Sequence, residues 1–72
     1  MFNTLDLHGM NVSEAKIELD HRIASIKEGE LTVIHGYSSN TLQQFVRKKY
    51  HHKKVVRKIL TMNPGETILV IK

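Results

Sequence analysis

Two histidines, each followed directly by a glycine, are the residues of this chain best suited to chemistry. His8 precedes Gly9, and His35 precedes Gly36. Imidazole titrates near neutral pH, so it can accept or release a proton in general acid–base catalysis. Our hypothesis is that one histidine acts as a general base on water or on a ribose 2′-hydroxyl. The other histidine would then protonate the leaving oxygen.

Asp6 belongs to the same short segment as His8. Alternation over Thr4–His8 predicts a strand with Asp6 and His8 on one side and Leu5 and Leu7 on the other. On that side Asp6 could orient an imidazole or hold a divalent ion such as Mg²⁺ or Mn²⁺. The alternative is a solvated carboxylate at the edge of the sheet. The spacing matches no dedicated metal motif, so we assign no metal ligands.

The helix that follows is indicated by apolar residues that recur every three or four positions. Asn11 and Glu14 have the spacing of a capping box, and Gly29 lies where the helix would end. The expected inward stripe comprises Val12, Ala15, Leu19, Ile23 and Ile26, widened by Ile17 and Ala24.

Leu31–His35 is rich in aliphatic and β-branched residues, which predicts a second strand, buried on both faces. A second helix is expected to begin at Ser39 or Asn40 and to end near His51. Its inward side would carry apolar residues such as Phe45.

Val55–Leu60 and Thr67–Ile71 predict a terminal β-hairpin, because Asn63, Pro64 and Gly65 between them favour a turn. The alternative is a second helix that continues to Leu60. The order β-α-β-α-β-β predicts an α/β (α+β) fold, a two-layer sandwich in which two helices cover one face of a mixed four-stranded sheet. If the first two strands are neighbours, the two histidines should converge at their carboxyl ends.

Length and composition indicate one small globular domain over residues 1–72. The chain is 40% hydrophobic and 25% charged, and it contains no cysteine, which excludes disulfides and thiolate zinc sites. We see neither a basic leader nor an apolar run of about 20 residues that could span a membrane. We therefore expect a soluble cytoplasmic protein without a membrane partner.

Charge divides unevenly along the chain. Residues 1–36 carry three basic and six acidic side chains, whereas residues 37–72 carry eight basic and one acidic side chain. Seven Lys and Arg residues lie between positions 47 and 58 with no acid among them. Such a run predicts a polyanionic partner, with nucleic acid favoured, although a membrane surface or an acidic protein also fits.

The segment Gly36–Thr41 is a candidate phosphate site, because it leads into the free N–H groups of the second helix. Ser38, Ser39 and Thr41 add hydroxyl donors. Tyr37 could stack on an unpaired base or pack over the loop.

Three segments together resemble the signature segments of the Smr (small MutS-related) domain family: Leu5–Gly9, Ile34–Gly36 and Gly65–Val70. The resemblance covers nearly the whole chain, with little extension, as in a stand-alone member. It implies a two-layer fold like that of the C-terminal domain of bacterial translation initiation factor 3. It also implies binding to DNA or RNA, which many members of the Smr family nick. In such members the positions of Asp6 and His8 are implicated in cleavage.

The loop departs from the family pattern. His35 and Gly36 match its start, but Ser38 and Asn40 replace its later glycines, and Gln43 replaces a basic residue. Serine and asparagine can still donate hydrogen bonds to phosphate, and asparagine tolerates a left-handed backbone. These departures put cleavage in more doubt than binding.

We interpret the chain as a nucleic-acid-binding domain with endonuclease activity on DNA or RNA, single-stranded or structured. The predicted catalytic residues are Asp6, His8 and His35, and the predicted phosphate or nucleic-acid contacts are Gly9, Gly36, Tyr37, Ser38, Ser39, Asn40, Arg47, Lys48, Lys53, Lys54 and Arg57. The alternative is a catalytically silent module that docks on structured RNA or on a ribonucleoprotein such as the ribosome. An enzyme acting on small phosphorylated metabolites is less favoured, because so short a chain can hardly enclose a pocket.

Overall fold

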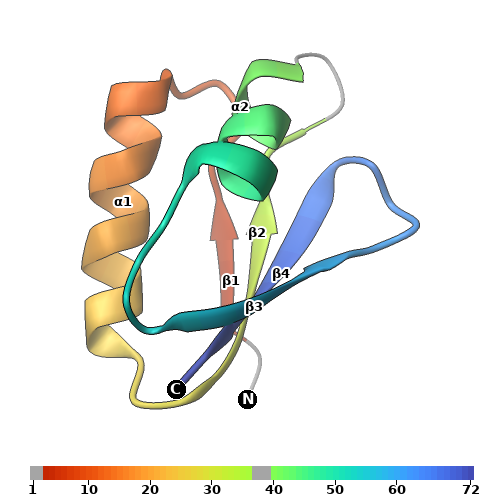
Figure 1. The fold of residues 1–72 in the computed structure, drawn as a ribbon. Coiled ribbons are helices and arrows are strands. Elements are labelled where there is room, and N and C mark those ends of the chain that lie inside the picture. The colour runs from red at the N-terminus through yellow and green to blue at the C-terminus, as the bar shows by residue number, and fades with distance from the viewer. Residues whose placement is uncertain (1–2, 37–39) are drawn as a thin grey trace.

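The computed structural model describes residues 3–36 and 40–72, and its elements follow the predicted order β-α-β-α-β-β (Figure 1). The elements are β1 (Asn3–Asp6), α1 (Val12–Ser25), β2 (Gly29–Ile34), α2 (Asn40–Gln44), a π-helical segment η1 (Phe45–Lys49), β3 (Val55–Leu60) and β4 (Glu66–Ile71). The predicted boundaries shift by a few residues at the strand ends.

The four strands form one mixed sheet in the order β1-β2-β4-β3. β1 and β2 are parallel, and the register pairs Leu5 with Val33 and Asp6 with Ile34. β4 lies antiparallel to both β2 and β3. The carboxyl ends of β1, β2 and β3 and the start of β4 therefore meet at one edge of the sheet. We call this edge the site edge.

α1 begins with the predicted capping box. Asn11 Oδ1 accepts a hydrogen bond of 2.8 Å from the backbone N–H of Glu14, and the Glu14 carboxylate accepts one of 3.0 Å from the N–H of Asn11. The apolar stripe is narrower than predicted, because Ile17 is 67% exposed and Ala24 is also exposed. Ala15, Leu19 and Ile23 make the fully buried contact.

The second helix ends in a π turn. The backbone N–H of Tyr50 donates to the carbonyl of Phe45, five residues earlier, at 2.7 Å. Tyr50 is buried, and its hydroxyl donates to Asp20 Oδ1 on α1 at 2.6 Å. The alternative of a helix running to Leu60 was wrong, because the chain is extended from Val55 onward.

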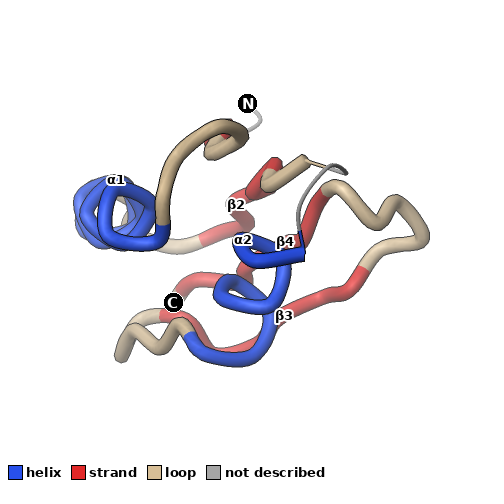
Figure 2. Tube along the Cα trace, turned by 90° about the horizontal axis from the view of Figure 1, so that it is seen from above, coloured by secondary structure: helices blue, strands red, loops and turns tan. Residues whose placement is uncertain are grey.

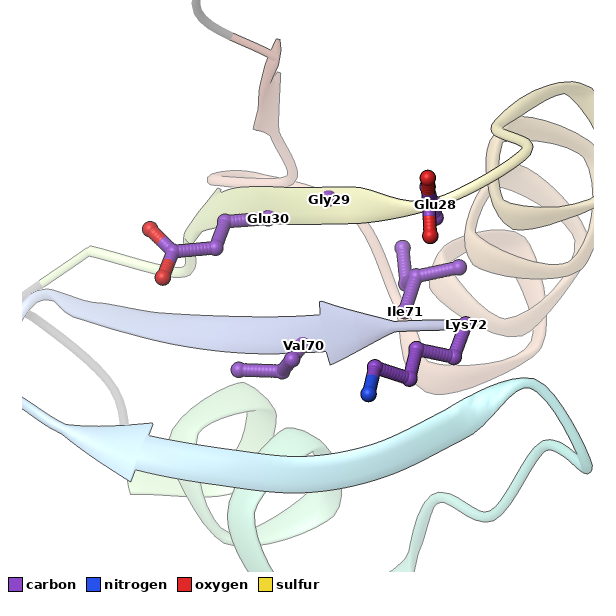
Figure 3. A pocket seen from close by; sticks show the side chains of 6 residues that line it. All are labelled: Glu28, Gly29, Glu30, Val70, Ile71 and Lys72. Carbon is purple, nitrogen blue, oxygen red and sulfur yellow. The ribbon is translucent and has the colours of Figure 1, made fainter.

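The core lies between one face of the sheet and both helices, as expected for a two-layer sandwich. Leu31 and Val33 of β2 face this core, whereas Thr32 and Ile34 on the other face are half-buried. The prediction that this strand is buried on both faces was therefore wrong. A hollow lies at the end of the sheet opposite to the site edge. Figure 3 shows it with the strands in front and the helices behind them. It is lined by Glu28, Gly29, Glu30, Val70, Ile71 and Lys72.

The β3–β4 hairpin extends away from α1, and α2 lies between the two in both views (Figures 1 and 2). β3 is an edge strand with an irregularity between Val55 and Arg57. Among the described residues, none of the helices has both the length and the apolar character needed to span a bilayer.

Candidate functional site

Asp6 and His8 form a hydrogen-bonded pair where β1 ends at the site edge. His8 Nδ1 lies 2.7 Å from Asp6 Oδ1, and the backbone N–H of His8 donates to the same oxygen at 3.0 Å. The side chains are 73% and 50% exposed for His8 and Asp6, respectively. The predicted alternation is confirmed, because both side chains project from the same side of the strand while Leu7 is buried between them.

This pairing determines what the imidazole of His8 can do. Hydrogen bonds from His8 hold the pKa of the Asp6 carboxyl below its usual value, so Asp6 is an anion that accepts hydrogen bonds. A neutral imidazole that donates from Nδ1 carries its lone pair on Nε2. The arrangement therefore leaves an exposed imidazole oriented by a carboxylate, with Nε2 available to remove a proton.

Two glycines with positive φ border this pair. Gly9 (φ +83°) follows His8 directly, and a Cβ added there would meet nothing within 4 Å. Gly36 (φ +86°) follows β2, and an added Cβ would lie 3.4 Å from His8 Cβ. The loop after β2 thus passes His8 closely, and the backbone around the exposed imidazole carries little side-chain bulk.

His35 does not share this exposed position. β1 and β2 are neighbours, as predicted, but the register places His35 beside the buried Leu7, and Gly36 beside His8. His35 is only 2% exposed, and its Nε2 lies 3.0 Å from Thr67 Oγ1 in the core. The expected convergence of the two imidazoles does not occur, because they lie on opposite faces of the sheet.

A buried network surrounds His35. Arg47 Nε donates to Thr67 Oγ1 at 2.8 Å, and Arg47 Nη2 donates to the carbonyl of Glu66 at 2.9 Å. Burial lowers the pKa of His35, and the positive charge of Arg47 acts in the same direction. Among the described residues His35 Nδ1 has no hydrogen-bond partner. Arg47 is a predicted phosphate contact, but in the structure its two hydrogen bonds link the second helix to β4.

Two lysines of the basic run also make internal contacts. Lys54 Nζ donates to the carbonyls of Ile26 and, at 3.3 Å, Ile23, at the C-terminal end of α1. Lys58 Nζ donates to the carbonyl of Tyr50 at 2.6 Å, and burial lowers its pKa. These ammonium groups stabilise the negative ends of helices. Their charges are therefore less available to a partner than the sequence suggested.

Four basic side chains of the run remain exposed: Lys48, Lys49, Lys53 and Arg57. We call these four residues the basic group. None of their side chains makes a hydrogen bond or an ion pair within residues 3–36 and 40–72. Because Lys54 binds the end of α1 and His8 precedes its start, this 14-residue helix separates Lys53 from His8 by about 20 Å.

The loop after Gly36 falls largely outside the described residues, and with it the predicted contacts of Tyr37, Ser38 and Ser39. Asn40 is exposed at the start of α2. Gln43, at the position where the family pattern has a basic residue, donates from Nε2 to the carbonyl of Pro64 at 2.9 Å. It therefore links α2 to the β3–β4 hairpin.

Sequence reasoning missed Thr67 and Gly65, which organise the site edge from the hairpin. Thr67 is fully buried between His35 and Arg47, and the carbonyl of Gly65 accepts hydrogen bonds from the N–H groups of His35 (2.9 Å) and Gly36 (3.1 Å). A polar residue on the inward face of a predicted strand was the available signal for Thr67. Nothing local in the sequence identifies the role of Gly65.

Asp6 is paired with His8 and is not part of a larger ligand cluster. Within the described part of the chain, no group of three or more His, Asp or Glu side chains is placed to hold a metal ion. The role of Mg²⁺ or Mn²⁺ therefore stays a prediction from sequence. Asp6 is the predicted carboxylate for such an ion, and Glu66 at the start of β4 is a second carboxylate at the site edge.

Comparison with known proteins matches residues 5–67 to the model of the Smr domain family. The matched region includes Asp6, His8, Gly9, Gly36 and the basic run at positions 47–58. No curated protein and no solved structure matches the chain.

Proposed function

The chain belongs to the Smr domain family, and from this membership we propose that it is a nucleic-acid-binding endonuclease in which His8 is the general base. Membership supports nucleic-acid binding or nicking at the level of the family. The observation that carries the catalytic part of the proposal is the exposed Asp6–His8 pair, joined at 2.7 Å.

In the proposed reaction, His8 Nε2 removes a proton from water or from the 2′-hydroxyl of an RNA strand. The resulting oxygen attacks phosphorus, and the bond from phosphorus to the leaving oxygen breaks. The proton held by His8 passes to that leaving oxygen. Asp6 is a positioning residue that keeps the imidazole in the correct tautomer and stabilises its protonated form. His35 is too deeply buried to contact the phosphate directly.

Binding is assigned to two regions. The turns at Gly9 and Gly36 bring backbone close to His8, where the scissile phosphate would lie. The exposed basic group supplies cations for phosphates farther along the strand, an interaction that weakens as salt rises.

The test compares the parent chain with His8→Ala and Asp6→Asn on single-stranded and structured RNA and DNA, with Mg²⁺, with Mn²⁺ or with EDTA. We expect His8→Ala to abolish cleavage and to retain binding, and Asp6→Asn to slow cleavage by about 10²- to 10⁴-fold. His21→Ala, which removes another exposed histidine, is the matched control. Cleavage that survives in His8→Ala would refute the role of His8.

A second candidate is a module that binds nucleic acid or a ribonucleoprotein such as the ribosome without cleaving it. The position of His35 favours this candidate, because the second imidazole expected at the site edge faces the core instead. Salt-sensitive binding by the parent chain, with no cleavage under any of the metal conditions, would establish the silent module.

A further inference from the structure

The tip of the β3–β4 hairpin exposes apolar side chains. Met62 is 102% exposed, and Leu60, the last residue of β3, is 58% exposed. A soluble domain gains no stability from a methionine that contacts nothing else. In a small domain whose other apolar side chains are mostly buried, this tip is a candidate contact surface.

The tip is held in one shape by its own hydrogen bonds. Thr61 Oγ1 donates to the carbonyl of Asn63 at 3.0 Å and accepts from its N–H at 3.2 Å. Asn63 Oδ1 accepts from the N–H of Gly65 at 2.9 Å. Met62 therefore projects from an ordered turn, which lowers the entropy cost of using it in an interaction.

The same turn is tied to the site edge. The carbonyl of Gly65 accepts from His35 and Gly36, and the carbonyl of Pro64 accepts from Gln43. The hairpin tip, the loop beside His8 and the start of the second helix are thus held together. Since His8 follows β1 and the tip follows β3, three strand spacings separate them across the sheet, about 14 Å.

The β3–β4 hairpin and the turn before it carry a net positive charge, which favours a polyanion. β3 leads to the tip from the basic group, with Lys53 just before the strand and Arg57 within it. Between positions 31 and 72 the sequence has a single acidic residue, Glu66 at the start of β4. A ligand that combines negative charge with flat apolar faces is a nucleic-acid strand whose bases are unpaired.

We propose that Met62 packs against an unpaired nucleobase of the strand whose backbone lies at His8. This inference rests on the proposed function and adds a base-contacting residue to it. A thioether packs favourably on an aromatic ring, and methionine and leucine serve as wedges between bases in other nucleic-acid complexes. A separation of about 14 Å corresponds to about four stacked nucleotides, at 3.4 Å each.

The test measures the affinity of the purified chain for one RNA sequence in two forms, single-stranded and fully paired with its complement. Met62→Gln keeps the length of the side chain and removes its apolar character. Ile17→Gln makes the same kind of change at an exposed apolar residue of α1, far from the site edge. We expect Met62→Gln to lose about two- to tenfold in affinity for the single strand. The affinity of Met62→Gln for the duplex should equal that of the parent. Ile17→Gln should bind the single strand and the duplex with the affinities of the parent.

Met62 is refuted as a base contact if Met62→Gln binds the single strand as tightly as the parent, or if it weakens both RNA forms equally. The proposed function is tested separately by the parent chain. Binding and His8-dependent cleavage by the parent, with no effect of Met62→Gln, would overturn only this inference. Failure of the parent to bind either RNA form would overturn both.

Discussion

His8 contributes to the low pKa of Asp6 through both its ring and its backbone N–H. Replacing His8 with alanine removes the ring and keeps the backbone donor. We therefore expect the pKa of Asp6 to rise toward the ordinary aspartate value of 3.8 in His8→Ala and to stay low in the control His21→Ala. A carboxyl NMR titration measures the pKa of Asp6 in both variants. An unchanged Asp6 pKa in His8→Ala would mean that the pair does not persist in solution.

The imidazole of His35 should titrate below its ordinary value. Burial lowers its pKa from 6.5 in the folded protein, and Arg47 adds to the effect, whereas the backbone of Gly36 and, more weakly, the charge of Glu66 oppose it. Between the folded pKa and 6.5 the unfolded chain holds more protons than the folded one, so the free energy of unfolding decreases as pH falls through that window.

NMR titration of the histidine ring protons gives the pKa of His35 directly, and urea unfolding at several pH values gives its effect on stability. His35→Gln should show a weaker pH dependence of stability in the same window. A ring that titrates at or above 6.5 would contradict the lowered pKa.

The sequence predicts correctly on which side of β1 His8 lies and misplaces His35, for a physical reason. Alternation placed Asp6 and His8 on one side of a half-buried strand, and the structure confirms this. The same alternation along β2 places His35 on the side of Leu31 and Val33, which face the core. The sequence predicts that this strand is buried on both faces, and in such a strand alternation does not indicate which way His35 points.

At the scale of elements, adjacent lysines have different roles. Lys54 Nζ binds carbonyls at the end of α1, whereas Lys53 is exposed. Lys54→Met keeps the apolar stem and removes the helix-end contact, so we expect it to lower the free energy of unfolding by about 1–2 kcal/mol. Lys53→Met should change stability by less than about 0.5 kcal/mol and should weaken RNA binding.

Urea unfolding and RNA affinity, measured on both variants, separate the two roles. Each lysine variant is the control for the other, because both lose one positive charge. Equal stability of the two variants would refute the capping role of Lys54. Stronger loss of RNA binding in Lys54→Met than in Lys53→Met would show that Lys54 leaves the helix to contact phosphate.

Element types were predictable because their signals are local. The capping box of α1 and the turn residues of the hairpin act through neighbours in sequence. The exposure of Ile17 and the helix-end contacts of Lys54 and Lys58 depend on which elements pack together, so spacing alone could not predict them.

At the scale of the whole molecule, His8 at the site edge lies far from Lys53 of the basic group. His8 precedes the start of α1 and Lys53 lies near its end, about 20 Å away for a 14-residue helix. One strand that contacts both must extend over at least that distance. A short ligand that reaches the imidazole of His8 cannot also reach Lys53.

We therefore expect affinity and cleavage rate to rise with the length of a single-stranded RNA until it reaches at least about six nucleotides, at 3.4 Å each. The dependence of affinity on salt should steepen over the same range, because longer strands engage more of the exposed cations. Lys53→Met should flatten this dependence for long strands and leave the shortest ones unchanged. A plateau at two or three nucleotides would mean that the basic group does not act on the strand held at His8.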